Sequence, residues 1–114
     1  MRERRVTVTR EQIVAYAEAS GDHNPIHLDE KFARSVGLPG VIAHGMLQMG
    51  LLASVAVEEA GDPRRLTRLS CRFAGMVRPG DEITYRAEAN DGGLKLSAVN
   101  QNGEAVLSRA SANY

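Results

Sequence analysis

The feature that most constrains this chain is a long apolar segment, residues 45–60, whose composition predicts a helix. Its large side chains do not form one stripe. They point in nearly every direction around a helix of 3.6 residues per turn: Met46, Leu47, Met49, Leu51, Leu52, Val55 and Val57. Polar character returns only at Glu58 and Glu59, before Gly61 ends the helix. Because a helix of this kind must be buried on most sides, the rest of the chain is expected to wrap it.

The residues after this helix alternate between apolar and polar with a period of two, which is typical of β-strands. The apolar faces of the first two segments are formed by Leu69, Cys71 and Phe73, and by Ile83, Tyr85, Ala87 and Ala89. Hairpin signals at residues 90–93 and 102–103 separate two further strands, expected near 94–100 and 104–112. Residues 6–9 form another short β-prone segment.

Together these segments predict an α+β domain in which a curved antiparallel sheet is wrapped around the long helix. With 114 residues, 43% of them hydrophobic, the chain is expected to form a single domain, residues 1–114, with one modest core. A single layer of this kind leaves an edge strand open and part of the helix exposed. Pairing of two copies would cover both, so a dimer is expected.

The segment before the long helix is predicted to contain a helix, a polar loop and a second short helix. Thr9 and Gln12 have the spacing of a capping box, in which each side chain accepts a hydrogen bond from the other residue's main-chain N–H. The first helix is expected to end at Ser20 and Gly21. Residues 21–28 are expected to form the loop, and Asp29 to cap the second helix.

Residues suited to catalysis are concentrated in this loop, where Asp22, Asn24 and His27 supply a carboxylate, an amide and an imidazole. Pro25 fixes its own φ and restricts Asn24, so the loop can hold these groups in one arrangement. An imidazole titrates near neutral pH and a nearby carboxylate can orient it, which suits general acid/base catalysis. Taken alone, the spacing favours a structural interpretation, an Asx-turn plus a histidine satisfied by other contacts.

Composition excludes several classes of function. Basic and acidic side chains balance at 14 each and aromatic residues are 4%, so nucleic acid is not expected as a partner. The single cysteine, Cys71, allows no internal disulfide and is expected to pack in the core. The most apolar stretch, residues 46–57, is too short to span a membrane. No secretory leader is visible at the start, so a cytoplasmic location is expected.

A specific resemblance adds to this evidence. The run Tyr16-Ala-Glu-Ala-Ser-Gly-Asp-His-Asn-Pro-Ile-His27 resembles the signature of the MaoC-like dehydratases, also called (R)-specific enoyl-CoA hydratases or hydratase 2. The likeness continues through residues 37–46, 72–73 and 78–81 and covers the larger part of the chain. The segments Ala43-His-Gly-Met46 and Gly61-Asp-Pro63 are similar to the catalytic subunit of (R)-3-hydroxyacyl-ACP dehydratases.

The resemblance implies a hotdog fold and a hydro-lyase that adds water reversibly to a trans-2-enoyl thioester, giving an (R)-3-hydroxyacyl thioester. It implies that Asp22 and His27 hold the water, or the departing hydroxyl, beside the β-carbon and share the proton transfers. Asn24 would help to fix substrate or water. No cofactor is implied. Which residue handles which proton stays open, as do the acyl length, the pathway and the carrier, CoA or acyl carrier protein.

The start of the long helix is the expected site for the thioester group. Free N–H groups and the positive end of the helix dipole would stabilise negative charge on the thioester oxygen there, and Gly45 has no side chain to block its approach. His44 is expected to line the substrate site, with a histidine satisfied by the main chain as the alternative. Met46 and Met49 are expected to pack in the core and to line the acyl channel.

A metal site is the competing use of these polar residues. Its ligands would come from a set of five: Asp22, His23, His27, Asp29 and His44. No metal is expected, because the motif already gives Asp22 and His27 other roles. His23 occupies the variable position of the motif and is expected to face solvent.

A partner subunit is also expected. Members of the family usually carry a longer N-terminal segment with an extra strand, whereas only residues 1–8 precede the predicted helix cap here. A second subunit, identical or homologous, would then complete the acyl pocket in a homodimer or heterodimer.

Two other functions fit a hotdog fold. A thioesterase would be expected to carry a carboxylate on the long helix, but this helix has no acidic residue before Glu58. A non-catalytic acyl-binding subunit would be expected to have lost Asp22 or His27, and both are present. Hydration of an enoyl thioester is therefore the favoured function.

Overall fold

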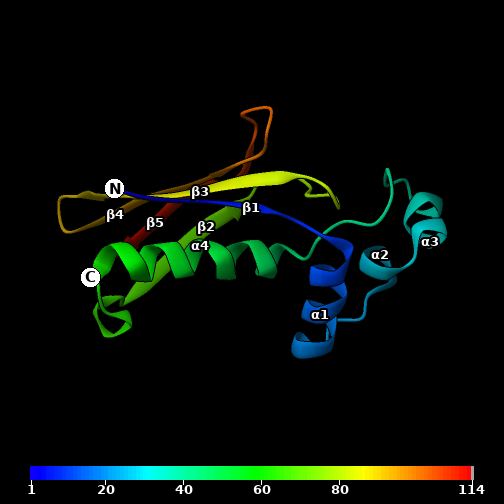
Figure 1. Cartoon of the computed structure of the whole chain (residues 1–114), viewed down its shortest axis with the longest axis horizontal. Coiled ribbons are helices and arrows are strands. Elements are labelled where there is room, and N and C mark those ends of the chain that lie inside the picture. Colours follow the sequence, from blue (N-terminus) through cyan, green and yellow to red (C-terminus); the bar gives the residue numbers. More distant parts are fainter. Residues whose placement is uncertain (114) are drawn as a thin grey trace.

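The computed structural model describes residues 1–113 (Figure 1). In chain order the elements are β1 (Arg2–Thr7), α1 (Arg10–Ser20), α2 (Pro25–Leu28), α3 (Glu30–Ser35), α4 (Gly45–Ala60), the 3-10 helix η1 (Pro63–Arg65), β2 (Arg68–Phe73), β3 (Glu82–Asn90), β4 (Gly93–Val99) and β5 (Ala105–Asn113). The strands form one sheet with α4 along one face, and α1, α2 and α3 lie beyond one end of α4 (Figure 1).

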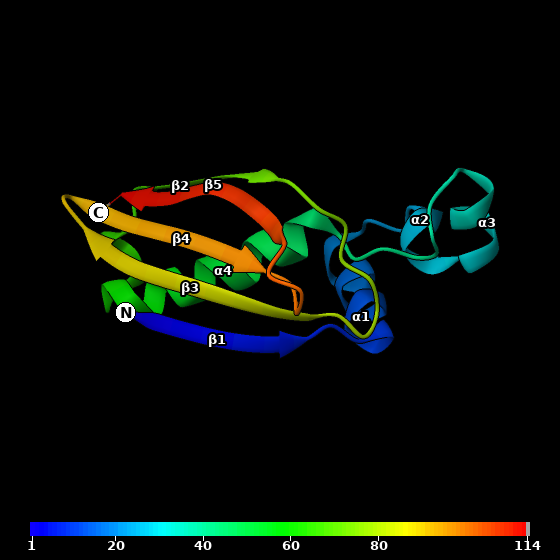
Figure 2. The ribbon, with the colours of Figure 1, turned by 90° about the horizontal axis from the view of Figure 1, so that it is seen from above.

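The sheet is antiparallel throughout, with its five strands in the order β1-β3-β4-β5-β2 (Figure 2). Side chains alternate between its two faces. On β3, Ile83, Tyr85 and Ala87 are buried toward α4, whereas Arg86 and Glu88 are exposed. The two outermost strands, β1 and β2, each have an edge without a neighbouring strand among residues 1–113.

The hydrophobic core lies between α4 and the sheet. From α4 it takes Leu52, Val55 and Ala56, all fully buried. The sheet contributes buried apolar residues of β3, β4 and β5, chiefly Ile83, Tyr85, Ala87, Leu94, Leu96, Ala98, Val106, Leu107, Ala110 and Ala112. Full burial of one large aliphatic or aromatic side chain is worth roughly 1.5–3 kcal/mol. This interface is therefore the main source of stability, and it fixes the position of α4 against the sheet.

A buried polar pair joins α4 to β3. The hydroxyl of Tyr85 donates a hydrogen bond to Oε1 of Gln48, and the two residues are 0% and 3% exposed. Burial raises the pKa of the Tyr85 hydroxyl, because a phenolate there would lose its hydration. The Nε2 group of Gln48 has no hydrogen-bond partner among residues 1–113. The pair anchors the first turn of α4 to the middle of the sheet.

The predicted capping box of α1 is confirmed. The Gln12 N–H donates to Oγ1 of Thr9 at 3.1 Å, and the Thr9 N–H donates to Oε1 of Gln12 at 3.2 Å. The helix ends at Gly21, whose φ of 78° lies in the left-handed region that glycine adopts without strain. The local sequence therefore determines both ends of α1.

Two segment boundaries differ from the sequence prediction. Residues 25–28, expected to be loop, form the one-turn helix α2, because Pro25 supplies a helical φ at the first position and Asn24 caps it. The N-terminal strand is Arg2–Thr7 and not residues 6–9. Its pairing with β3 runs from Arg2, opposite Ala87, to Thr7, opposite Glu82.

The apolar face predicted for β2 is only partly buried. Leu69 and Cys71 pack against the core as expected, each half-buried. Phe73 was expected in the core but is 57% exposed. Phe73 is the last residue of an edge strand, and it lies beside the exposed start of α4, before the first buried residue of that helix, Gln48.

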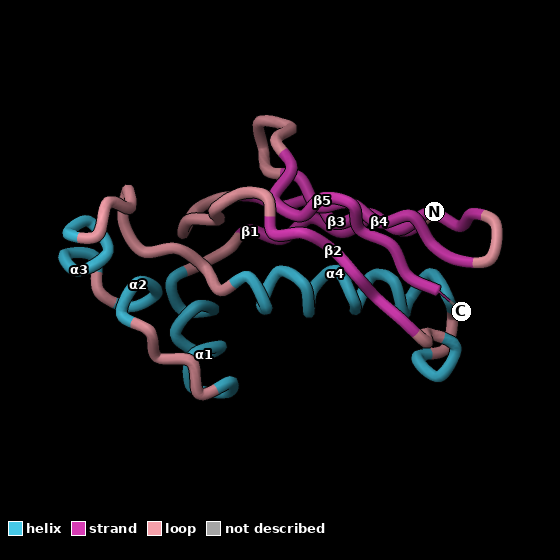
Figure 3. The backbone as a smooth tube through the Cα atoms, turned by 180° about the vertical axis from the view of Figure 1, so that it is seen from behind, coloured by secondary structure: helices cyan, strands magenta, loops and turns pink. Residues whose placement is uncertain are grey.

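Within this chain, α4 is covered on one side only. Its buried residues are Gln48, Leu52, Val55, Ala56 and Ala60, whereas Met46 is 57% exposed. Figure 3 shows the sheet on one side of α4 and, among the residues described, no element along the opposite side. The expectation that α4 is buried on most sides is therefore not met by one copy, because a single sheet covers one face of a helix.

A curved antiparallel sheet packed on a long central helix confirms the predicted α+β hotdog fold. In the part of the chain that the structure describes, no helix combines the length and apolar character needed to cross a membrane.

Candidate active site

Asp22 lies in a short connection that is ordered by its own side chains. The Asp22 N–H donates to Oγ of Ser20, the Asn24 N–H to Oδ1 of Asp22, and the Ile26 N–H to Oδ1 of Asn24, each at 3.2 Å. These successive side-chain turns satisfy main-chain donors that no helix or strand satisfies. The second carboxylate oxygen of Asp22, Oδ2, is left facing His27.

His27 is held from the side opposite Asp22. Its Nδ1–H donates to the main-chain carbonyl of Ile42 at 2.7 Å, and the Ile42 N–H donates to the carbonyl of Ile26 at 3.2 Å. Because Nδ1 carries the proton in this bond, Nε2 of the neutral ring carries the lone pair. The ring is 8% exposed, so its orientation is fixed by packing as well as by this hydrogen bond.

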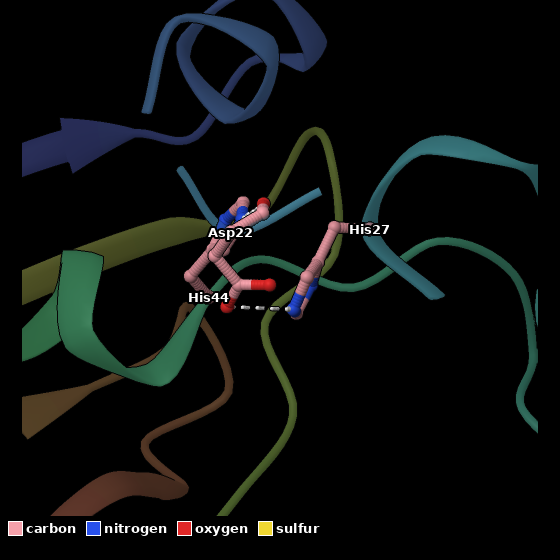
Figure 4. A group of neighbouring side chains, drawn as sticks. All are labelled: Asp22, His27 and His44. Atoms are coloured by element: carbon pink, nitrogen blue, oxygen red, sulfur yellow. Dashed lines mark hydrogen bonds and ion pairs between the residues drawn. The ribbon is translucent and has the colours of Figure 1, made fainter. Parts of the chain in front are cut away.

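The reactive ends of these two residues meet. Nε2 of His27 lies 3.9 Å from Oδ2 of Asp22, and the carboxylate is about half exposed, at 52%. Figure 4 shows the carboxylate turned toward the imidazole across this gap. The gap is too long for a direct hydrogen bond, but both atoms can reach one water oxygen at about 2.8 Å. The pair can therefore hold a water and exchange protons with it.

His44, the residue immediately before α4, lies directly behind this pair. It is 2% exposed, and its Nε2–H donates to the main-chain carbonyl of Asp22 at 3.0 Å. Its ring stacks on that of His27, with centroids 3.8 Å apart and planes 24° apart, and the Tyr16 ring lies on it at 4.8 Å. Nδ1 of His44 has no hydrogen-bond partner among residues 1–113.

A cleft of about 450 Å³ opens over the pair. It is lined by residues from α1, α2, the start of α4 and the end of β2: Tyr16, Ser20, Asp22, His27, His44, Gly45, Met46 and Phe73. Four residues on which the sequence prediction depends, Asp22, His27, His44 and Gly45, thus share one cavity, together with Met46. Met49, further along α4, and Asn24 are not among the residues that line it.

The start of α4 forms one wall of the cleft. The side chain of His44, the N-cap residue, makes no capping hydrogen bond, and the Leu47 N–H donates to the His44 carbonyl at 3.2 Å. The N–H groups of Gly45 and Met46, which come before it, have no side-chain cap. A Cβ added at Gly45 would lie 2.9 Å from Cδ1 of Phe73, so the Phe73 ring covers this glycine closely. Any larger residue at this position would require the Phe73 ring to move.

Asn24 acts on the site through the main chain. Its Oδ1 caps α2, the helix that carries His27, and its side chain is exposed. Capping fixes the first turn of α2 and with it the position of His27. The contact with substrate or water expected from the sequence stays a prediction.

The five residues considered as metal ligands do not come together. His23 is exposed beside Glu18, with Nε2 3.5 Å from Oε1, and Asp29 caps α3 through the Phe32 N–H. Asp22, His27 and His44 do place one donor atom each within 4.8 Å of the others. However, the two imidazoles are stacked with their planes 24° apart, and one nitrogen of each already donates a hydrogen bond to a main-chain carbonyl, His27 to Ile42 and His44 to Asp22.

Sequence reasoning missed three contributions to this site. No role in the site was predicted for Tyr16 or Ser20, and Phe73 was expected only on the apolar face of its strand. Tyr16 opens the signature run, which is the signal that could have placed it near Asp22. Phe73 gave no such signal, because alternation predicts which face of a strand a residue occupies but not where the covering helix stops.

The fold and this site define a class: hotdog domains with a carboxylate and an imidazole facing each other at the start of the central helix. Residues 1–109 match the family described as MaoC like domain, and the chain belongs to this family.

Individual relatives agree with the assignment. The chain is 42% identical over 73 residues to the fatty acid synthase subunit beta of Aspergillus oryzae, covering 62% of this chain and 4% of that protein. It is 32% identical over 108 residues to the peroxisomal hydratase-dehydrogenase-epimerase of Neurospora crassa, covering 94% of this chain and 12% of the relative. The structure of an (R)-hydratase from A. caviae, involved in PHA biosynthesis, superposes with a TM-score of 0.82 and 25% identity, over 96% of this chain and 89% of that one. The chain thus spans a small part of the two longer relatives and most of the (R)-hydratase.

Proposed function

We propose that this chain is a hydro-lyase that catalyses the reversible hydration of trans-2-enoyl thioesters to (R)-3-hydroxyacyl thioesters. One observation carries the proposal: Oδ2 of Asp22 and Nε2 of His27 face each other at 3.9 Å in a cleft that begins at the N-terminus of α4. The names of the N. crassa and A. caviae relatives, a hydratase-containing enzyme and an (R)-hydratase, support the reaction and its stereochemistry.

In the hydration direction, the water bound between Asp22 and His27 adds its oxygen to the β-carbon of the enoyl group. One of its protons passes to the acid/base pair, and the pair returns a proton to the α-carbon, so that H and OH are added across the double bond. The lone pair on Nε2 and the carboxylate are both able to accept the proton from water. Dehydration is the reverse of these steps.

The thioester oxygen becomes more negative as the β-carbon is attacked. The N–H groups at the start of α4, with Gly45 leaving room beside them, are placed to stabilise that charge. Removal of one such donor typically costs about 3 kcal/mol of barrier. The acyl chain then runs past Met46 and Phe73, which supply the apolar side of the cleft. CoA and acyl carrier protein are both compatible carriers.

We further propose that the active form is a dimer, either with a second copy or with a homologous hotdog subunit. The support is the exposed apolar surface at one end of the single chain: Met46, Phe73 and Met76 are 57%, 57% and 52% exposed. Two of these side chains line the cleft, so a partner covering them would also close the acyl site. Phe73 is also the last residue of β2, whose outer edge has no neighbouring strand among residues 1–113.

The structure offers little support for the thioesterase alternative. The acidic residues of α4, Glu58 and Glu59, lie at the opposite end of the helix from the cleft. They pair there with the Arg4 side chain and with the terminal amine of Met1. Neither carboxylate is among the residues that line the cleft.

The test is a hydration assay of the purified protein with trans-2-enoyl-CoA substrates of increasing chain length, monitored by loss of the enoyl absorbance and by chiral analysis of the product. Formation of the (R)-3-hydroxyacyl thioester supports the proposal. Release of free thiol without hydration would identify a thioesterase instead. If neither product forms, alone or after addition of a homologous subunit, the catalytic proposal is wrong.

A further inference from the structure

We propose that His44 is a positioning residue for the acid/base pair, which holds Asp22 and His27 at their working separation without itself exchanging a proton with substrate. This inference rests on the proposed hydratase function. The sequence left two expectations open for His44, a residue that lines the substrate site and a histidine satisfied by the main chain.

The first contact is a hydrogen bond to the main chain. The Nε2–H of His44 donates to the carbonyl of Asp22 at 3.0 Å, on the residue whose carboxylate faces the water site. This bond links the connection between α1 and α2 to the residue that begins α4, 22 positions along the chain. The carboxylate of Asp22 is itself about half exposed, so anchoring its main chain is the most direct way to limit its movement.

The second contact is ring stacking. The His44 and His27 rings lie nearly parallel, with centroids 3.8 Å apart, and Tyr16 lies on His44 at 4.8 Å. One flat side chain therefore touches both members of the pair, Asp22 through an edge nitrogen and His27 through its face. Stacking on His44 restricts the tilt of the His27 ring, and the hydrogen bond from Nδ1 to the Ile42 carbonyl restricts its rotation.

Stability alone does not explain a histidine at this position. The ring is 2% exposed and its Nδ1 has no hydrogen-bond partner among residues 1–113, an arrangement that is unfavourable for folding. It makes no capping hydrogen bond to α4 either. The role that fits both contacts is to fix the relative geometry of Asp22 and His27, because misplacement of reacting groups by about 1 Å can lower a rate about 100-fold.

Three substitutions separate the two contacts. His44→Phe keeps a flat ring for stacking and removes the donor, His44→Gln keeps an N–H donor at a similar reach and removes the ring, and His44→Ala removes both. We expect His44→Ala to lower kcat about 10- to 100-fold with KM changed less than about 3-fold, because an altered geometry affects the transition state more than substrate binding. We expect His44→Gln to recover at least part of that loss. His23→Ala, in the same connection but exposed, is the matched control and should leave kcat unchanged.

A double-mutant cycle then distinguishes positioning from direct catalysis. If His44 acts through His27, adding His44→Ala to His27→Ala lowers the residual rate no further, because the effects of residues that act as a unit are not additive. Circular dichroism and thermal unfolding identify variants that fail to fold.

A wild-type kcat in the His44→Ala variant would overturn the inference while leaving the hydratase function intact. So would fully additive losses in the cycle, or an effect confined to KM. Lack of hydration by the wild-type protein would instead remove the function on which the inference rests.

Discussion

The Nδ1–H of His27 donates to the main-chain carbonyl of Ile42 at 2.7 Å, and this bond decides which nitrogen of the ring faces Asp22. Ile42 lies in the extended segment that leads from α3 to α4. The orientation of the His27 ring is therefore set by a main-chain carbonyl, which substitution of the Ile42 side chain does not remove.

The acid/base pair gives the first prediction. Asp22→Asn and His27→Ala are each expected to lower kcat about 10²- to 10⁴-fold, because each removes a group that exchanges a proton with water. Hydration of a trans-2-enoyl-CoA, measured at saturating substrate, checks the result. Unfolding curves matching the wild type exclude global loss of structure, and a variant that retains most of its rate would argue against the assignment of that residue.

Gly45 gives the second prediction. Gly45→Ala is expected to lower kcat about 10-fold or more, because the new methyl group narrows the approach to the first N–H groups of α4. It would also lie 2.9 Å from the Phe73 ring. Phe73 is exposed and can move, so the change in unfolding free energy should be small. If the steric conflict with Phe73 were the whole cause, adding Phe73→Ala would restore the rate; we expect the double variant to stay impaired.

Asn24 gives the third prediction, and its variants separate two roles. Asn24→Ala removes the cap of α2 and should destabilise the protein by about 1 kcal/mol, whereas Asn24→Asp keeps an oxygen that can cap. If Asn24 acts only by capping, Asn24→Asp retains both stability and rate. A stable Asn24→Asp variant with a much lower kcat would show instead that the amide contacts substrate or water. Urea unfolding and the hydration assay together decide.

The buried pair of Tyr85 and Gln48 gives the fourth prediction. Tyr85→Phe is expected to reduce the unfolding free energy by about 1–3 kcal/mol, because the carbonyl of Gln48 then loses its donor inside the core. Replacing both partners in Tyr85→Phe/Gln48→Met should cost less than the two single changes together, because no polar group remains unpaired. Chemical denaturation of the four proteins measures this. Strictly additive losses would contradict it.

The fifth prediction concerns alkaline pH. Burial raises the pKa of the Tyr85 hydroxyl in the folded state above its ordinary value of 10.0. The folded state therefore holds this proton more tightly than the unfolded state. The resulting stability is complete below about pH 10 and is lost progressively as the pH rises from there toward the higher folded pKa. Denaturant midpoints between pH 8 and 11 should fall at the upper end.

The Cys71 thiol must be controlled for in this measurement, because burial raises its pKa as well. The Cys71 thiol has an ordinary value of 9.0, so its contribution to stability begins to be lost about one pH unit earlier. A Cys71→Ala background removes it. Adding Tyr85→Phe to that background should flatten the remaining decline, and an unchanged decline would assign it to other groups.

The fold was predictable from the sequence because its signals are local and repeated. Alternation placed Ile83, Tyr85 and Ala87 on the buried face of β3, and the capping spacing of Thr9 and Gln12 marked the start of α1. The departures occur where local signals do not decide. The burial of Phe73 depends on how far α4 reaches under the sheet, which is a property of the whole assembly of elements.

The candidate site was predictable in part. The spacing of Asp22 and His27 alone favoured a structural interpretation, but the resemblance indicated a shared site, and the structure brings the two residues together. The role of Ile42 and the stacking of His44 on His27 could not be predicted, because Ile42 and His44 lie in the irregular segment between α3 and α4, 15 and 17 positions along the chain from His27. Irregular segments have no repeating pattern from which such contacts can be inferred.

Two different parts of the chain build this cleft. The groups proposed to move protons are positioned by α1, α2 and the residues just before α4, whereas Phe73 enters from β2 and Met46 from the open side of α4. Substitutions at Phe73 or Met46 can therefore change the length or shape of acyl group accepted while leaving the reaction itself intact. The same scaffold can serve new substrates without a new catalytic apparatus.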